Sequence, residues 1–259
     1  MIGILYFLVI LIANTVGAIS GMGGGVLIKP IFDFIGADSV ASVSFFSTVA
    51  VFTMSLVSTT RQLQSGMKIK LFIVLNISLG AIIGGILGNN CFEFLLRHIS
   101  SEDNLLLIQI FITILTLLFA FYYNRKPFAA YHFASWFWYL LCGVFLGFLA
   151  SFLGIGGGPI NVSLLMLLFS FPIKEAAVYS IATIFFSQLA KILTITFTTG
   201  FYRYNMHMLY FIIPAAILGG LLGAKCSNLF SEKRVSFVFQ IVILLVITIN
   251  LFNGWQLLG

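Results

Sequence analysis

Apolar segments follow one another along almost the whole chain, separated by short polar connections. Many of these segments reach the roughly 20 residues that a helix needs to span a bilayer, and they are too long for the core of an ordinary soluble domain. Charged residues make up 8% of the sequence, whereas soluble domains contain roughly 25%. The sequence therefore predicts an all-α, multi-pass membrane protein that has no sizeable soluble domain.

The charge and the potential metal ligands exclude several other classes of protein. The net charge of +6 comes mainly from lysines and arginines in short loops, without a basic run and interleaved aromatic residues, so it does not indicate a nucleic-acid partner. Cys91, Cys142 and Cys226 lack the spacing of a metal site and are interpreted as small packing residues. Because the segments contain no cluster of carboxylate, histidine and cysteine, we expect neither a metal ion nor a cofactor.

The chain contains an internal repeat. The motif "GMGGG" in the first half returns as "GIGGG" in the second, and further blocks match in the same order with only short gaps between them. Such self-similarity indicates a duplication. We therefore expect a first transmembrane repeat at 1–124, a linker at 125–135 and a second transmembrane repeat at 136–259. The matching blocks are 21–25 with 154–158, 41–48 with 177–184, and 81–94 with 216–229.

Each half contains five apolar segments, and the second one is short in both. It has about 13 residues, or roughly 20 Å as a helix, which is less than the thickness of the hydrocarbon core. If the short segment dips and returns, each half crosses four times and the halves are parallel. If it completes a crossing with the help of loop backbone, each half crosses five times and the halves are inverted. The expected segments are 2–20, 24–36, 39–60, 70–92, 104–123, 136–153, 158–171, 175–199, 208–229 and 234–252.

The positive residues of the loops favour the inverted arrangement. If every segment crosses, nine lysines and arginines fall on one side and only two, Arg97 and Arg203, on the other. The re-entrant alternative divides the same residues six to five, which hardly satisfies the positive-inside rule. We therefore expect five plus five segments in inverted halves, with both termini outside the cell. The nine residues are Arg61, Lys68, Lys70, Arg125, Lys126, Lys174, Lys225, Lys233 and Arg234.

Two runs of three glycines interrupt the apolar chain at membrane depth. Non-helical backbone is tolerated there only where protein or a watery cavity satisfies it. Each run precedes a short helix, and Pro159 stands where a first helical turn needs no N–H donor. Close helix packing explains the spaced glycines of 81–94 and 216–229 well but explains three consecutive glycines poorly. The runs at 23–25 and 156–158 therefore predict broken helices whose N-termini face an anion.

Polar residues embedded in the segments add to this site. Lys29 and Asp33 share one face of a helix, where they form either a structural ion pair or part of the site. Lys191 lies on a polar stripe, and we expect a bound anion or Asp33 to supply its counter-charge. The candidate substrate-binding residues are Gly23, Gly24, Gly25, Lys29, Ser44, Ser47, Gly156, Gly157, Gly158, Asn161, Ser180, Thr183, Gln188 and Lys191, and Asp33 is the candidate for proton coupling.

The paired glycine motifs, each opening one of two similar halves, resemble the TauE/SafE sulfite exporter family, also called the TSUP transporters. The resemblance covers nearly the whole chain. It implies a multi-pass transporter of the bacterial or archaeal inner membrane that moves sulfite, sulfonates or related small anions. In the second half Pro159 directly follows the glycines, and Ser163 stands where Pro30 stands in the first, so the two halves are not equivalent at this point.

The sequence therefore favours a secondary transporter of a small oxyanion, driven by a proton or cation gradient. An anion channel is the alternative that the sequence separates least well. An intramembrane enzyme is disfavoured because the embedded serines have no partner histidine, and no metal site is evident. The sequence leaves the particular anion, the direction of transport and the formation of a homo-oligomer open.

Overall fold

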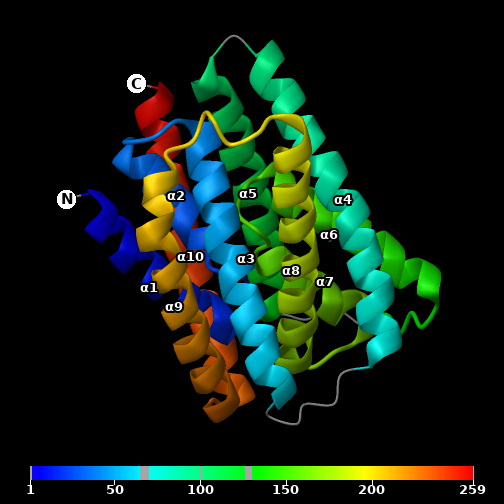
Figure 1. Cartoon of the computed structure of the whole chain (residues 1–259). Helices are drawn as coiled ribbons and strands as arrows, with labels where there is room; N and C mark the ends of the chain where they lie inside the picture. Colours follow the sequence, from blue (N-terminus) through cyan, green and yellow to red (C-terminus); the bar gives the residue numbers. More distant parts are fainter. Residues whose placement is uncertain (1, 65–69, 100, 126–129, 259) are drawn as a thin grey trace.

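The computed structural model describes residues 2–64, 70–99, 101–125 and 130–258, and the regular structure within these ranges is entirely helical (Figure 1). Seven of these helices, α1, α3, α4, α5, α8, α9 and α10, are long and apolar enough to cross a membrane. Each apolar segment predicted from the sequence corresponds to one helix. The helices are α1 (Ile2–Ser20), α2 (Gly25–Ile35), α3 (Val40–Gln64), α4 (Leu71–His98), α5 (Glu102–Arg125), α6 (Trp136–Phe152), α7 (Pro159–Phe169), α8 (Ile173–Thr198), α9 (Leu209–Leu229) and α10 (Glu232–Leu258), with a short 3₁₀ helix, η1 (Met206–Met208).

The short helices α2 and α7 each fold back along the helix that precedes them. Tyr6 near the start of α1 stacks on Phe32 near the end of α2, with 3.8 Å between ring centroids. Tyr139 of α6 meets Phe169 of α7 in a tilted arrangement, with 4.5 Å between ring centroids. Each pair of helices is therefore a hairpin whose ends lie at one face of the molecule and whose tip is buried inside it.

This geometry corrects the expectation that the short segments complete a crossing. Tyr6 also donates a hydrogen bond to Asp38, just before α3, so α3 starts at the face where α1 starts. Successive helices thus alternate in direction, as the five-plus-five arrangement assumes. However, α2 and α7 begin in the interior of the molecule instead of at the opposite face. An 11-residue helix is only about 16 Å long, and the glycine breaks leave it no further regular backbone with which to span the bilayer.

Contacts between helix ends define two faces of the molecule. We call the face that holds the start of α1 and the end of α10 the terminal face, which lies uppermost in Figure 1, and the other the far face. The Val40 amide donates to Glu102 at the terminal face, and Lys174 donates to the Phe230 carbonyl at the far face. Arg97 and Arg203 lie toward the terminal face. Of the nine residues predicted to share one side, Lys68 and Lys126 lie outside the described residues, and the other seven gather toward the far face.

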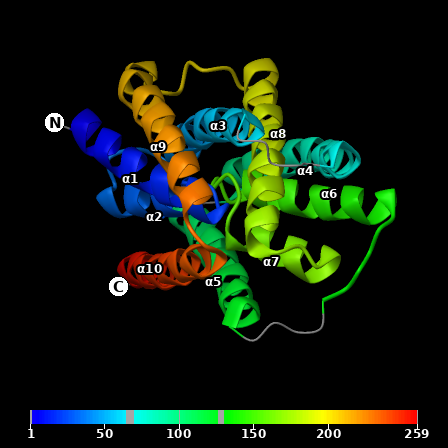
Figure 2. The ribbon, with the colours of Figure 1, turned by 90° about the horizontal axis from the view of Figure 1, so that it is seen from below.

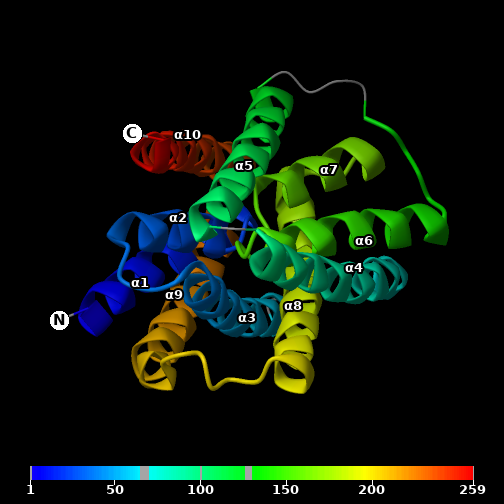
Figure 3. The ribbon, with the colours of Figure 1, turned by 90° about the horizontal axis from the view of Figure 1, so that it is seen from above.

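Helices of the first half pack beside helices of the second half. Viewed along the long helices, α1 lies beside α9 and α6 lies beside α4, with α3 and α8 between these pairs and α5 and α10 along another side (Figures 2 and 3). Glycines permit the close approach. A Cβ on Gly84 or Gly88 would collide with the backbone of α6, and one on Gly219 or Gly223 would collide with the backbone of α1. The packing interpretation of these spaced glycines is therefore confirmed.

Candidate functional site

The two glycine breaks meet at the centre of the molecule. Gly23, with φ of 77°, and Gly156, with φ of 66°, adopt the left-handed region that favours glycine. Each break is tied to the helix before it, because the Gly23 amide donates to the Gly17 carbonyl and the Gly156 amide donates to the Ala150 carbonyl. A Cβ on Gly23 would lie 3.5 Å from the Gly156 carbonyl oxygen, so the two breaks are in direct contact.

The glycines at the start of α2 allow the two breaks to contact each other. A Cβ on Gly25 would collide with the Ile155 carbonyl of the second break and would lie 2.8 Å from Ser47 Oγ. A Cβ on Gly24 would collide with the side chain of Asn14. Dense packing and a site function are therefore not alternatives at this position, because both require backbone without side chains.

The second break approaches the central helices in the same manner. Gly157 and Gly158 have φ of 132° and 158°, and Gly158 directly precedes Pro159, the first residue of α7. A Cβ on Gly157 would lie 2.5 Å from Ile184 of α8 and 3.3 Å from Nδ2 of Asn161. The N-termini of α2 and α7 therefore both open into the same buried region, with the positive ends of both helix dipoles. The Leu27 amide already donates to Gly24 and the Asn161 amide to Gly158, and Pro159 has no N–H, so only the amides nearest each break remain as donors.

Serines from α3 and α8 hold the break of the opposite half. Ser180 donates to the Gly21 carbonyl at 2.6 Å. Ser44, its counterpart in the repeat, lies against Gly154, where a Cβ would come within 2.5 Å of the hydroxyl oxygen. The structure thus brings both predicted serines to the breaks, each crossing from one half of the chain to the other.

Several predicted side chains are buried without a hydrogen-bond partner at some of their polar atoms. Ser47 Oγ and both amide atoms of Asn161 have no partner, and each of these residues is fully buried. Gln188 donates to Ser187 Oγ at 3.3 Å, but its amide oxygen has no partner. Thr183 instead donates to the Tyr179 carbonyl of its own helix, which leaves it as an acceptor only. Unpaired buried polar atoms are costly, so water or a ligand is expected at these atoms.

Lys191 lies at the same centre and is 1% exposed. Its ammonium donates to Ser44 Oγ and to the Ser151 carbonyl, both at 2.8 Å, and lies 5.4 Å from the centre of the Phe92 ring. Ser151 belongs to the last turn of α6, so the negative end of that helix faces the ammonium. Both hydrogen-bond acceptors are neutral dipoles. A bound anion would add the full negative charge that balances the ammonium.

Lys29 and Asp33 form an ion pair on α2. Their side chains, 3% and 5% exposed, meet at 2.8 Å. Asp33 is therefore the partner of Lys29, which removes it as the direct counter-charge of Lys191. A small cavity of about 10 Å³, close to the space of one water, adjoins this pair beside Ile155 of the second break.

Sequence reasoning missed three polar residues at the centre. Asn14 donates to the Ala50 carbonyl at 3.2 Å and leaves its amide oxygen unpaired against Gly24. Gln109 donates to the Phe152 carbonyl at 2.7 Å, at the start of the second break. Ser163 is buried with an unpaired hydroxyl. Asn14 and Gln109 are isolated polar residues in the long apolar segments 2–20 and 104–123, which is the signal that could have found them, whereas the sequence identifies Ser163 only as the counterpart of Pro30.

A polar cavity of about 320 Å³ opens between the ends of α4 and α8 near the terminal face. Arg203, in the connection after α8, forms a two-bond ion pair with Glu93, which lines this cavity. Burial alone would lower the pKa of the Arg203 guanidinium, but its bonds to Glu93 and Tyr204 outweigh burial and raise that pKa. The pair thus keeps its positive partner charged and links α4 to the α8–α9 connection.

A helical fold with many apolar spans and two broken hairpins that meet in a polar centre indicates a membrane transporter. Comparison with known proteins agrees. The chain matches the family model "Sulfite exporter TauE/SafE" over residues 6–251. It is therefore a multi-pass membrane transporter that belongs to the TauE/SafE family.

Two curated relatives carry transporter names. The chain is 26% identical to "Probable membrane transporter protein YunE" of Bacillus subtilis, over 91% of this chain and 92% of that protein. It is 28% identical to "Probable membrane transporter protein MJ0441" of Methanocaldococcus jannaschii, over 40% of this chain and 41% of that one. No solved structure matched the chain significantly. These names describe transporters and not enzymes, in line with the interpretation of the sequence.

Proposed function

We propose that this protein carries a small oxyanion, such as sulfite or a sulfonate, across the membrane and binds it where the two breaks meet. The observation that supports this most strongly is the convergence of two helix N-termini on buried groups that lack partners. Ser47 and Asn161 come from different halves of the chain and each has unpaired polar atoms there. An oxyanion accepts hydrogen bonds from hydroxyl, amide and backbone N–H donors at once.

The proposed ligands surround the anion from both halves. Gly24 and Gly25 supply backbone donors at the start of α2, and Gly157 and Gly158 supply them before α7. Gly23 and Gly156, whose amides donate to Gly17 and Ala150, shape the walls of the proposed site. Lys191 contributes the positive charge, and Lys29 adds a second cation beside the other break. The remaining members of the proposed set are Ser44, Ser47, Asn161, Ser180, Thr183 and Gln188.

The proposed transport cycle uses the packing of helices of one half against helices of the other. The contacts of α1 with α9 and of α6 with α4 support inverted repeats at 1–124 and 136–259, joined by a linker at 125–135. Rocking of one repeat against the other would open the centre alternately to the two faces. Asp33 is the proposed coupling group, because protonation of a buried carboxylate would release Lys29 from its ion pair.

The test is a thermal-shift series on the purified protein with sulfite, thiosulfate, taurine, sulfoacetate and simple carboxylates. A ligand at 100 times its Kd stabilises the folded state by about 2.7 kcal/mol, which is readily measured. Ser47→Ala should abolish the shift that sulfur oxyanions produce. Ser58→Ala is the matched control, because Ser58 lies on the same helix and is also buried and unpaired, away from the breaks. The proposal fails if no oxyanion stabilises the protein, or if both variants respond alike.

Flux measurements separate a transporter from an anion channel. In proteoliposomes, a carrier that binds its anion should exchange external labelled sulfite for internal unlabelled sulfite in a saturable manner. A channel should equilibrate the label without such counterflow. Conductive flux that does not saturate would replace the carrier with the channel.

A further inference from the structure

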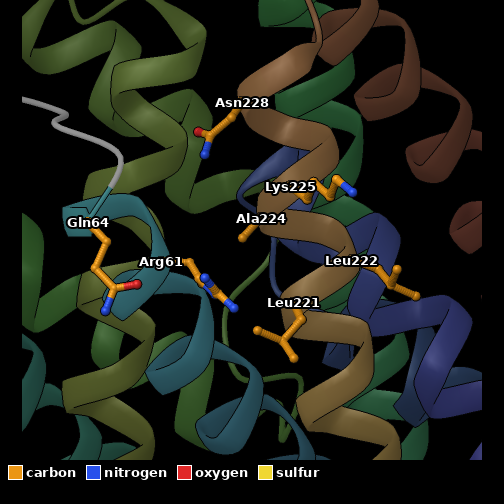
Figure 4. Close-up of a pocket in the computed structure, with 7 residues that line it drawn as sticks. All are labelled: Arg61, Gln64, Leu221, Leu222, Ala224, Lys225 and Asn228. Atoms are coloured by element: carbon orange, nitrogen blue, oxygen red, sulfur yellow. The ribbon is translucent and has the colours of Figure 1, made fainter.

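A groove lies between the far-face ends of α3 and α9, well away from the glycine breaks. It comprises two adjoining cavities of about 420 and 410 Å³ that share Arg61, Gln64 and Leu221. Figure 4 shows Arg61 reaching from α3 toward α9, with Asn228 of α9 turned back toward α3. Lys225 and Leu222 also line the groove, and Figure 4 shows their side chains directed to the side of α9 that faces away from Arg61.

The groove is polar at the far face and apolar further into the membrane. Arg61 belongs to the last turn of α3, and Lys225 lies about one turn from the end of α9, where the headgroup region of a bilayer begins. Leu56 and Leu222, 46% and 49% exposed, lie further from the helix ends and face outward. A molecule that fits the groove therefore has a polar end at the far face and an apolar end directed into the membrane.

The polar end of the groove is positive. Arg61 and Lys225 line it with the amides of Gln64 and Asn228, and no carboxylate is among its lining residues in the described part of the chain. The described residues also show no salt bridge to either cation. Two exposed cations to which the described residues supply no carboxylate favour an anionic occupant.

The corresponding cavity in the other half shows that the fold does not require these cations. In the repeat, Asn90 stands where Lys225 stands, and Glu93 stands where Asn228 stands. The cavity of about 320 Å³ between α4 and α8 therefore has a carboxylate in its wall, which Arg203 neutralises. Arg97 lines this counterpart cavity as well, so the two cavities differ in the carboxylate, which lines only the cavity between α4 and α8 among the described residues.

We propose that this groove binds an anionic phospholipid. The Arg61 guanidinium holds the phosphate, because a guanidinium pairs with phosphate oxygens through two bonds, and the long stem of Lys225 lets its ammonium turn round α9 to the same phosphate. Gln64 bonds the hydroxyl groups of the headgroup, and an acyl chain lies over Leu56 and Leu222. The site is separate from the proposed transport site, so either proposal can fail without the other.

The test uses the full-length protein in detergent and in nanodiscs. Native mass spectrometry should show phosphatidylglycerol retained in preference to phosphatidylcholine. The Arg61→Gln, Lys225→Gln double variant should lose at least tenfold in affinity for phosphatidylglycerol. Lys233→Gln, a charge change on the same face outside the groove, should leave that affinity unchanged. Arg61 and Lys225 are exposed, so the variant should fold normally.

Three results would overturn the proposal. Equal retention of both lipids would mean that the groove binds acyl chains without regard to charge. Inorganic phosphate that binds as tightly as the lipid and displaces it would identify a site for small free anions. A double variant that has lost sulfite flux in liposomes of phosphatidylcholine alone would identify the groove as a mouth of the transport pathway.

Discussion

At the scale of single residues, Lys191 is the clearest link between the fold and an anionic substrate. Its ammonium is held by a serine of α3 and a carbonyl of α6, so three helices fix its position at the centre. Both partners are neutral. The charge is therefore positioned before any ligand arrives, and such preorganisation is what an anion site requires.

We predict that Lys191→Gln weakens the binding of sulfite at least tenfold, which is about 1.4 kcal/mol, without preventing insertion or folding. Lys191→Arg should retain part of the affinity because the charge remains. Titration calorimetry on the purified variants measures the change, and size-exclusion profiles in detergent control for folding. Unaltered affinity in Lys191→Gln would show that the lysine has only a structural role.

A second prediction concerns Gly25, where a Cβ would collide with the Ile155 carbonyl. Gly25→Ala should push the two breaks apart, lower the unfolding temperature and abolish transport. Gly254→Ala is the control, because a Cβ there meets only Ile110 at 3.6 Å. Alanine within a helix is about 0.5–1 kcal/mol more favourable than glycine, so this control should be neutral or stabilising. Thermal unfolding of the two variants should therefore shift in different directions, and equal shifts would contradict the crossing of the breaks.

At the scale of elements, helix α2 combines a glycine start with a buried ion pair one turn further along. Removing one partner of such a pair leaves an uncompensated charge and typically costs about 3–5 kcal/mol. Lys29→Gln and Asp33→Asn should therefore each destabilise the protein, and the double variant should recover most of the loss. Thermal unfolding of the parent protein, the two single variants and the double variant measures the coupling between Lys29 and Asp33. Two additive losses would mean that the residues act independently.

The ion pair between Glu93 and Arg203 operates between elements, tying α4 to the α8–α9 connection at the terminal face. We expect Arg203→Gln to release this connection. Spin labels placed on α4 and on the connection should then move further apart or show a broader distance distribution than in the parent protein. An unchanged distribution would mean that the connection is held by its other contacts.

At the scale of the whole molecule, the apolar runs were sufficient to predict each α-helix of the described residues but not the 3₁₀ helix η1, and the repeat aligned Ser44 with Ser180, which lie at opposite breaks. The depth of α2 and α7 could not be predicted, because it depends on the packing of Tyr6 against Phe32 and of Tyr139 against Phe169. The pairing of α1 with α9 depends on Gly219 and Gly223, which lie in the second half of the chain. One of the two partners of Lys191 is a backbone carbonyl, and no residue pattern identifies such a group.

The sidedness of the molecule is still a prediction. The positive residues gathered at the far face indicate that this face is cytoplasmic and that both termini lie outside. In a background without the three native cysteines, single cysteines at Lys174 and Lys233 should resist an impermeant thiol reagent in intact cells, and one at Arg203 should react. The reverse pattern would invert the molecule in the membrane.

The central claim is that one oxyanion binds between the two glycine breaks. The most direct measurement is an experimental structure with selenite, a pyramidal analogue of sulfite whose selenium can be located by anomalous scattering. We predict a selenium peak bounded by Gly23, Gly157 and the Lys191 ammonium, and its loss in Lys191→Gln. A peak confined to the groove between α3 and α9, with none at the breaks, would contradict it.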